Sequence, residues 1–325
     1  MMPALYGGIV GDLLGVPAEF KGRGSFKIED VTGYGTYNQP PGTWSDDTSL
    51  TLCLIENLIE EKPVEDLMRK FVLYKNKGYW TPFNEMFDIG RTTIEAIHRF
   101  ENGVPPEKCG GSDPYDNGNG ALMRIGPVAF IIYRSFDFRE KVQTIKKYTE
   151  LTHSHPRAIV GSIIYIEFLL RILYNNSPKT ALEQIAKLFR ENYDREHPYI
   201  KEFKHYSRLF KPDFFSLPEK EIRSDGYVVH TLEAAIWCLG STSTLKDAVL
   251  KAVNLGDDTD TVASITYTMA GIWHKVKPNE HLSKHMDASP ADWRDAIARK
   301  EDVDELLNRF FEFCAEKAIK EEYGE

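Results

Sequence analysis

The chain has 325 residues, of which 42% are hydrophobic, and this is enough for a sizeable core in one large domain or two smaller ones. Its formal net charge is −9 at pH 7 and it contains no Lys/Arg run, which excludes a general nucleic-acid-binding role. The four cysteines are widely scattered and form neither a CxxC pair nor a zinc-ligand spacing, so we expect a reducing, cytoplasmic location.

Neither a secretory signal nor a membrane span is expected. Residues 1–16 lack a positively charged start and contain Asp12. The most apolar segment, residues 159–174, is interrupted by Glu167 and Arg171 and is too short to cross a bilayer. These two side chains are four residues apart and can pair on one helix face, so the segment is predicted to be a buried core helix.

Helical periodicity dominates the chain, whereas convincing period-two alternation is nearly absent. Helices are predicted, in chain order, at residues 50–59, 64–74, 92–100, 121–133, 158–174, 181–189, 227–239, 245–253, 262–276 and 303–319. No Gly/Ser-rich or Pro-rich linker divides them, so we expect an all-α fold in a single large compact domain over residues 1–325. Residues 191–223 are charged, aromatic and irregular, and are either a surface insertion or a solvated connection.

A glycine-rich stretch comes first. Gly7, Gly11 and Gly15 recur at a spacing that lets helices pack closely, and we expect them to serve the core. Glu19 follows between Ala18 and Phe20, an apolar setting that could hold a carboxylate near a metal ion.

An acidic run, residues 45–48 (SDDT), begins the next predicted helix. Ser45 is a good N-cap, and acidic residues are common in a first helical turn, so capping alone is one explanation. Carboxylates and hydroxyls are also the ligands that hard cations prefer. The stiff approach at residues 40–44 (PPGTW) is unusual for a mere surface cap.

Three central segments carry weaker signals. Asp88 precedes a predicted helix, where an isolated Asp is usually a cap. The Gly/Asn turn at residues 116–120 opens onto the helix predicted from residue 121, and free N–H groups in such a place suit a phosphate. His153 lies near a helix start, where a lone His is usually structural.

A second acidic run, residues 257–261 (DDTDT), lies near the other end of the chain. Its three carboxylates would repel one another without a cation. The apolar helix that follows looks buried, and buried charges are costly unless a partner such as a metal ion compensates them. If the two acidic runs meet in space, they could hold a pair of metal ions.

The second run has two other possible interpretations. Asp258, Asp260 and Thr261 resemble the DxDxT nucleophile motif of haloacid-dehalogenase-like phosphatases, but that motif needs a preceding strand, and residues 248–255 are predicted to be helical. An EF-hand loop counted from Asp258 would need Gly at its sixth position, which is Ala263.

Six motifs together resemble those of the ADP-ribosylglycohydrolase family, in the family's order and over most of the chain. They are GDxxGxxxE at residues 11–19, W[ST]DDT at 44–48, FDIG at 87–90, GNGxxMR at 118–124, TH at 152–153 and DTDT at 258–261. The resemblance implies an all-α fold and two divalent cations, Mg²⁺ or Mn²⁺. The implied ligands are Ser45, Asp46, Asp47, Asp258, Asp260 and Thr261. Asp257 stands where many relatives carry Gly, so it is not expected to be a ligand.

The same resemblance implies a substrate and the residues that act on it. The substrate would be ADP-ribose joined through its distal ribose to a protein side chain, or a related ADP-ribosyl small molecule. Glu19 and Asp88 would supply acid/base chemistry. Residues that would contact the diphosphate or ribose are Asn119, Gly120, Ala121, Met123 and His153.

A non-catalytic relative remains an alternative, one that binds ADP-ribose or neutralises a toxin by contact. The intact aspartates argue against a loss of catalysis, whereas a toxin partner in addition to catalysis stays open.

Overall fold

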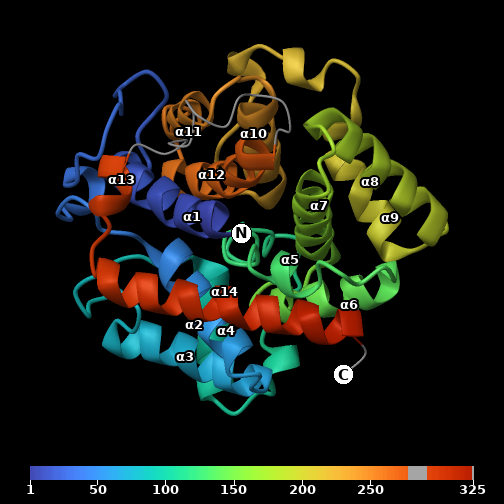
Figure 1. Cartoon of the computed structure of the whole chain (residues 1–325), viewed down its shortest axis with the longest axis horizontal. Helices are drawn as coiled ribbons and strands as arrows, with labels where there is room; N and C mark the ends of the chain where they lie inside the picture. Colours follow the sequence, from blue (N-terminus) through green and yellow to red (C-terminus); the bar gives the residue numbers. More distant parts are fainter. Residues whose placement is uncertain (277–290, 324–325) are drawn as a thin grey trace.

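Two helices from opposite ends of the chain, α1 (Met2–Gly15) and α12 (Thr259–Val276), pack antiparallel at the centre of the fold (Figure 1). A Cβ atom added to Gly11 would lie 2.4 Å from the carbonyl oxygen of Ala263, and one added to Gly15 would lie 2.3 Å from the Cα of Asp260. Only glycine permits this approach. The close packing predicted from the glycine spacing is therefore confirmed.

The computed structural model describes residues 1–276 and 291–323, and within these ranges it is all-α, with isolated β-bridges but no sheet. The other α-helices are α2 (Asp46–Ile59), α3 (Val64–Lys77), α4 (Arg91–Glu101), α5 (Val128–Ile131), α6 (Phe138–Thr149), α7 (Pro156–Leu173), α8 (Pro178–Asn192), α9 (Pro198–Phe203), α10 (Val228–Gly240), α11 (Leu245–Val253), α13 (Ala291–Asp295) and α14 (Lys300–Tyr323). No helix in the described ranges is both long and apolar enough to cross a membrane.

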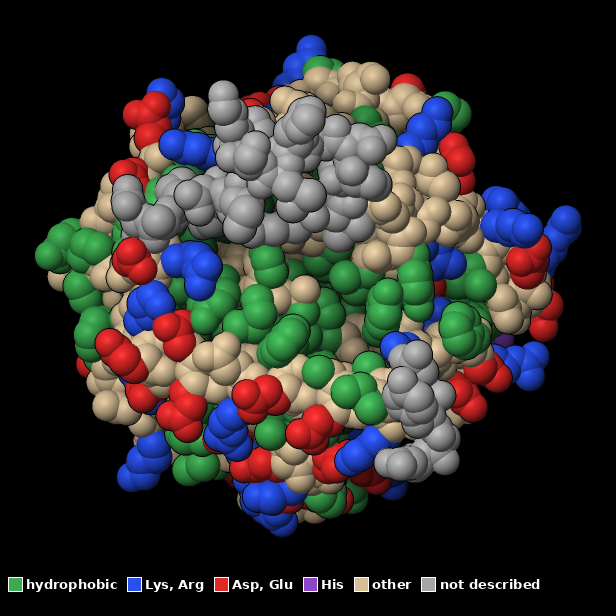
Figure 2. Space-filling view, viewed as in Figure 1, with side chains coloured by type: hydrophobic (Ala, Val, Ile, Leu, Met, Phe, Trp, Pro, Cys, Tyr) green, Lys and Arg blue, Asp and Glu red, His purple; other side chains and the backbone are tan. Residues whose placement is uncertain are grey.

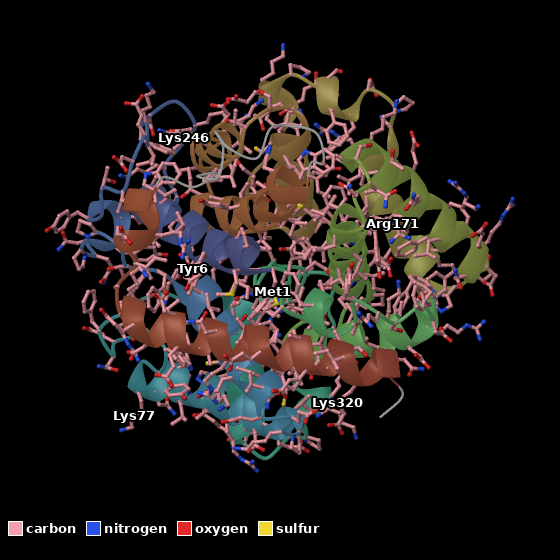
Figure 3. The ribbon with its side chains drawn as sticks, in the orientation of Figure 1. Met1, Tyr6, Lys77, Arg171, Lys246 and Lys320 are labelled. Atoms are coloured by element: carbon pink, nitrogen blue, oxygen red, sulfur yellow. The ribbon has the colours of Figure 1, made fainter. Side chains whose placement is uncertain are left out.

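The remaining helices surround the central pair. Helices α7, α10 and α11 pack on α12, while α14 crosses in front of α2 and reaches toward α5 (Figure 1). The hydroxyl of Tyr6, between α1 and α14 in Figure 3, donates to Asp304 at 2.6 Å. Hydrophobic side chains gather across the middle of this face, and charged side chains cluster along its lower rim (Figure 2).

Helix α7 is the buried core helix expected from its apolar sequence. Glu167 is fully buried in it and pairs with Arg171 on the same helix and with Lys141 of α6 at 2.7 Å. The two cations compensate the buried carboxylate, which would otherwise be costly.

One predicted helix is largely wrong. Residues 121–127 form turns, and helix is present only in the short α5. Pro127 explains the difference, because it has no N–H to donate and it disfavours helical geometry at the preceding residue, Gly126. The Gly/Asn turn therefore does not open directly onto a helix as predicted.

Residues 191–223 contain more helical structure than their sequence suggests. The segment includes the end of α8, α9, and the 3-10 helices η4 (Lys204–Phe210), η5 (Phe214–Ser216) and η6 (Glu219–Glu221). The buried ring of Tyr206 donates through its hydroxyl to the carbonyl of Arg157 at 2.8 Å. Part of the segment thus belongs to the core, and its description as an insertion stays a prediction.

Candidate active site

The two acidic runs meet at the N-termini of α2 and α12. The hydroxyl of Thr261 donates to Oδ2 of Asp47 at 3.1 Å, although the two residues are 214 positions apart in the chain. Both helix starts open onto a cavity of about 420 Å³. Predicted site residues that line it are Glu19, Asp46, Asp47, Asp88, Asn119, Gly120, Met123, His153, Asp258, Asp260 and Thr261.

Asp12 of α1 fixes the first acidic run. Its buried carboxylate accepts hydrogen bonds from the backbone N–H groups of Ser45 and Thr48, at 2.9 and 3.0 Å, and from the Thr48 hydroxyl at 2.6 Å. Ser45 in turn caps α2 by accepting from the N–H of Asp47 at 3.3 Å. Asp12 therefore fixes the backbone that carries Asp46 and Asp47, although it does not line the cavity itself. We did not predict Asp12 as a site residue.

The second run is placed by the contact between α1 and α12. The hydroxyl of Thr259 donates to the carbonyl of Gly15 at 2.7 Å, which seats the first turn of α12 against the end of α1. Asp260 is buried there. Asp257 is exposed, has a left-handed φ of +59°, and does not line the cavity. Its backbone geometry explains why glycine suits this position.

Burial and mutual repulsion make every acid in the cavity reluctant to ionise. Burial, together with the nearby Asp88 and Asp258 carboxylates, raises the pKa of Glu19 to about 9. Burial holds the pKa values of Asp46, Asp47 and Asp260 well above the ordinary value. Such a cluster either holds protons or needs cations.

The residues present suit a divalent cation. One carboxylate oxygen from each of Glu19, Asp258 and Asp260 lies within 4.8 Å of the others. Among the residues that line the cavity, three carboxylate oxygens are buried without a hydrogen-bond partner, and they belong to Glu19, Asp47 and Asp258. Buried, unpaired oxygens of this kind are the donors that Mg²⁺ and Mn²⁺ take. Glu19, predicted to be an acid/base residue, thus also lies where a metal ligand could.

Glu19 and Asp88 share a neighbour that we did not predict. The side chain of Tyr37, in η2 (Gly35–Tyr37), lies near both carboxylates. Burial raises the pKa of Asp88, while the neighbouring Tyr37 side chain opposes the shift. The tyrosine follows no motif, and no sequence signal distinguishes it from the other residues of its loop.

The Gly/Asn turn forms the opposite wall of the cavity. His153 is buried, and burial lowers its pKa to about 3, so it is neutral and accepts or donates a hydrogen bond without charge. A Cβ on Gly120 would lie 2.8 Å from the Thr93 hydroxyl and 3.1 Å from Cε1 of His153, so this position requires glycine. Ala121 is buried but does not line the cavity, in contrast to its neighbours Gly120 and Met123.

Helix α4, rather than the predicted helix at residue 121, begins at this wall. Gly90, Thr92 and Thr93 line the cavity at its first turn. The Thr93 hydroxyl is buried and has no hydrogen-bond partner, so it is available to a ligand. Helix N-termini attract anions.

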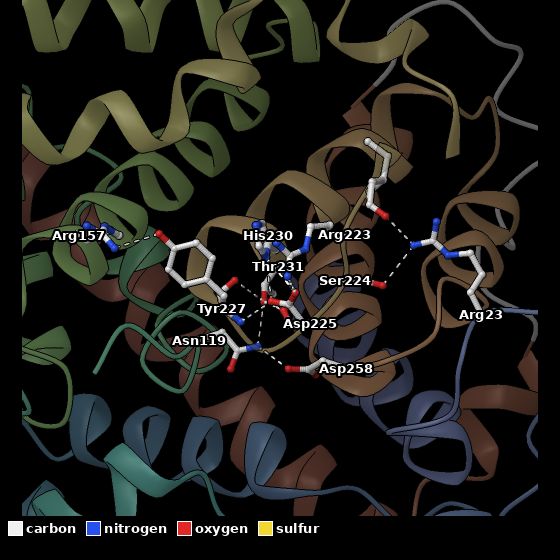
Figure 4. Close-up of polar contacts among 11 residues, drawn as sticks. Arg23, Asn119, Arg157, Arg223, Ser224, Asp225, Tyr227, His230, Thr231 and Asp258 are labelled. Carbon is white, nitrogen blue, oxygen red and sulfur yellow. Dashed lines mark hydrogen bonds and ion pairs between the residues drawn. The ribbon is translucent and has the colours of Figure 1, made fainter. Parts of the chain in front are cut away.

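A short strap, residues 224–228, ties the two walls together (Figure 4). The N–H of Asp258 donates to the carbonyl of Ser224, and that of Asn119 to the carbonyl of Gly226, both at 3.0 Å. The amide of Asn119 then donates to Asp258 at 2.7 Å and to the hydroxyl of Thr231 at 3.0 Å. Arg23 donates to the hydroxyl of Ser224 at the start of the strap, at 3.4 Å, and to the carbonyl of Ile222, two residues before it, at 2.6 Å.

Comparison with known proteins agrees with this arrangement. A family model described as ADP-ribosylglycohydrolase matches residues 1–319. The chain belongs to the ADP-ribosylglycohydrolase family. The family resemblance found in the sequence is thereby confirmed, and the protein is by class an ADP-ribosyl glycohydrolase, a hydrolase of glycosyl bonds.

Relatives of this ADP-ribosylglycohydrolase include two named ADP-ribosyl hydrolases, one of which is named for the linkage that it cleaves. The ADP-ribosylarginine hydrolase Tri1 of Serratia proteamaculans is 29% identical over 97% of this chain and 79% of its own. The ADP-ribosylhydrolase ARH3 of Gallus gallus is 22% identical over 83% of this chain and 84% of its own. A solved structure titled as an ADP-ribosylglycohydrolase-related protein complex superposes with a TM-score of 0.76 at 25% identity, covering 96% of this chain and 97% of that one.

The family assignment also bears on the phosphatase alternative. The residues before the second acidic run form helix α11 and a short turn, so the strand that a DxDxT nucleophile requires is missing from this part of the described chain.

Proposed function

We propose that this ADP-ribosylglycohydrolase is a dinuclear-metal-dependent hydrolase that removes ADP-ribose from a protein side chain, with arginine-linked ADP-ribose as its first substrate. The observation that carries the proposal is the meeting of the two acidic runs beside Glu19 and Asp88 in one cavity. The arginine linkage is supported by the similarity to Tri1, which is named for ADP-ribosylarginine.

Two divalent cations, Mg²⁺ or Mn²⁺, fit the proposed site. The residues that would hold them are Ser45, Asp46, Asp47, Asp258, Asp260 and Thr261. Bound cations supply positive charge for the hydroxyls of the distal ribose and for the attacking water. The buried, unpaired oxygens of Asp47 and Asp258 support this assignment, because a cation would satisfy them.

Glu19 and Asp88 divide the proton transfers. Hydrolysis breaks the bond between the anomeric carbon and the leaving nitrogen, and a water oxygen takes the place of that nitrogen. One carboxyl accepts a proton from the water and the other donates a proton to the leaving nitrogen. We propose that Asp88 donates the proton to the leaving nitrogen and that Glu19 accepts the proton from the water.

Asn119, Gly120, Met123 and His153 would bind the diphosphate and the ribose. A neutral His153 contacts phosphate as a hydrogen-bond donor, and its low pKa means that this contact does not change between pH 5 and 8. The backbone of Ala121 could contribute a donor even though its side chain does not line the cavity.

A substrate panel tests the proposal. The protein is incubated with arginine-linked, serine-linked and O-acetyl-linked ADP-ribose, first with Mg²⁺ or Mn²⁺ and then with EDTA, and released ADP-ribose is measured. We expect metal-dependent release from the arginine linkage. The variant Asp260→Asn should lose at least about 100-fold in kcat, as expected when a metal ligand is removed.

Asp257→Asn is the matched control, because it removes a carboxylate from the same run but outside the cavity. It should retain full activity. Binding of ADP-ribose without release from any substrate would favour the non-catalytic alternative, and full activity of Asp260→Asn would overturn the ligand assignment.

A further inference from the structure

Three aromatic side chains lie in a row beside Glu19 and Asp88, and one of them, Phe20, lines the cavity itself. The ring centroids of Phe20 and Tyr37 are 6.3 Å apart, and those of Tyr37 and Phe87 are 5.1 Å apart. We call these three residues the aromatic wall. Phe20 and Phe87 each adjoin one of the two acids in sequence, and the Tyr37 side chain lies near both acids.

Phe20 is unusual in both exposure and backbone geometry. Its side chain is 69% exposed although it lines the cavity, and its φ of +62° is left-handed. Such a φ is unfavourable for a residue with a Cβ and is readily adopted by glycine. The N–H of Phe20 donates to the carbonyl of Asp257 at 2.7 Å, and this hydrogen bond stabilises the backbone conformation that leaves the ring exposed. An exposed aromatic ring in a strained position is typical of a ligand contact.

We place the leaving group at the aromatic wall, because Phe20 adjoins Glu19 and both residues line the cavity. The Gly/Asn turn and His153 line the wall assigned to the diphosphate, whereas Glu19 and Asp88 lie with the acidic runs. A substrate whose distal ribose sits on the acidic runs would therefore extend its leaving group past the two acids and onto Phe20. The chemistry of the wall thus bears on which side chain carries the ADP-ribose.

Aromatic faces next to carboxylates recognise a flat cation. A guanidinium stacks on an aromatic ring and donates hydrogen bonds to carboxylates in its plane, which neither a serine hydroxyl nor an acetyl group can do. We propose that the aromatic wall binds the guanidinium of the modified residue, stacked on Phe20 and beside Glu19 and Asp88, and that it sets a preference for arginine-linked ADP-ribose. This inference rests on the proposed function and names the residues that select its substrate.

Phe20→Leu tests the wall by removing the aromatic face while keeping an apolar side chain. We expect KM for arginine-linked ADP-ribose to rise about 3- to 30-fold, the range that cation–π contacts span, with kcat nearly unchanged. KM for the serine-linked and O-acetyl-linked substrates should not change. Phe20→Gly should act in the same way and should fold at least as well as the wild type, because it relieves the left-handed strain.

Phe136→Leu is the matched control, because Phe136 is 90% exposed but lines a different cavity. A second measurement is independent of turnover: the dissociation constant of agmatine, which carries a bare guanidinium, is measured by NMR with Mg²⁺ and saturating ADP-ribose. It should increase about 3- to 30-fold in Phe20→Leu and stay constant in Phe136→Leu.

An unchanged agmatine dissociation constant in Phe20→Leu would contradict guanidinium binding by the aromatic wall, whether or not the enzyme is active. An equal rise in KM for all three substrates would also overturn it, because a selective contact cannot act on every leaving group. If the wild type releases ADP-ribose from none of the substrates, the proposed function is contradicted. The agmatine measurement would still test whether the aromatic wall binds a guanidinium.

Discussion

At the scale of single residues, the hydrogen bonds that each carboxylate accepts distinguish the roles of acids that look alike in the sequence. Asp12 receives donors from two backbone N–H groups and a hydroxyl, so its oxygens are committed to holding α2. Asp47 and Asp258 each keep one buried oxygen without a donor. Asp12 therefore has a structural role, whereas the other two have capacity left for a cation. The GDxxG motif marks Asp12, but its spacing alone does not distinguish these roles.

Thr231 is predicted to support the metal site without contacting a metal. It is buried, accepts from Asn119, and donates to the carbonyl of Asp225 at 3.1 Å (Figure 4). Thr231→Val would remove this support from the Asn119 amide, which orients Asp258. We expect a Mn²⁺ dissociation constant about 10-fold higher, measured by calorimetry, and a loss of about 1 kcal/mol in unfolding free energy.

Thr266→Val provides the comparison, because Thr266 is equally buried but its hydroxyl bonds to helix carbonyls such as that of Val262, at 2.7 Å. It should lose similar stability with unchanged Mn²⁺ affinity. Equal Mn²⁺ affinities in the two variants would show that Thr231 plays no positioning role.

At the scale of elements, the contact between α1 and α12 sets the position of the second acidic run. Gly15→Ala would place a methyl group 2.3 Å from backbone atoms of Asp260, and no side-chain movement can relieve this. We expect a loss of about 1–3 kcal/mol or more in unfolding free energy by urea titration, together with weaker Mn²⁺ binding.

Gly22→Ala is the control for replacing glycine by alanine without a steric clash, because nothing lies within 4 Å of the added Cβ. It should leave both stability and metal binding near wild-type values. Gly7→Ala clashes with Tyr267 at the other end of the contact, so it should cost stability with a smaller effect on the metal.

Elements were predictable where their signal is local. The glycine spacing predicted close helix packing, although not the partner helix α12, and the acidic runs predicted two helix starts. Both signals depend on neighbours three or four residues away. The prediction of a helix at residues 121–133 was wrong because Pro127 outweighs the apolar periodicity around it. Neither the strap at 224–228 nor Tyr37 carries a motif, since each acts through contacts with distant segments.

At the scale of the whole molecule, the buried acids make stability depend on pH and on metal. The folded state raises the pKa of Asp12 to about 6 and that of Glu19 to about 9, so between pH 4 and these values the folded chain binds more protons than the unfolded chain. Stability of the metal-free protein should therefore fall as pH rises from about 5 to 8. We expect the melting temperature in EDTA, measured by scanning calorimetry, to fall across this range.

Metal should reverse this trend. Mn²⁺ at about 100 times its dissociation constant contributes about 2.7 kcal/mol, and it acts most strongly at high pH, where the carboxylates are ionised. In Asp260→Asn the melting temperature in EDTA should depend less steeply on pH. A melting temperature in EDTA that rises steadily from pH 5 to 8 would contradict the assignment of raised pKa values to the cavity.

The distance in sequence between Asp47 and Thr261 has a consequence for how the enzyme is made. The two residues are 214 positions apart, and a ribosome adds about 5–20 residues per second, so the first acidic run emerges roughly 10–40 s before its partner. During that interval the glycine-bearing face of α1 lacks the helix that covers it. The nascent chain is therefore catalytically silent until translation has passed the second run, and messages truncated before that point yield chains that cannot assemble the site.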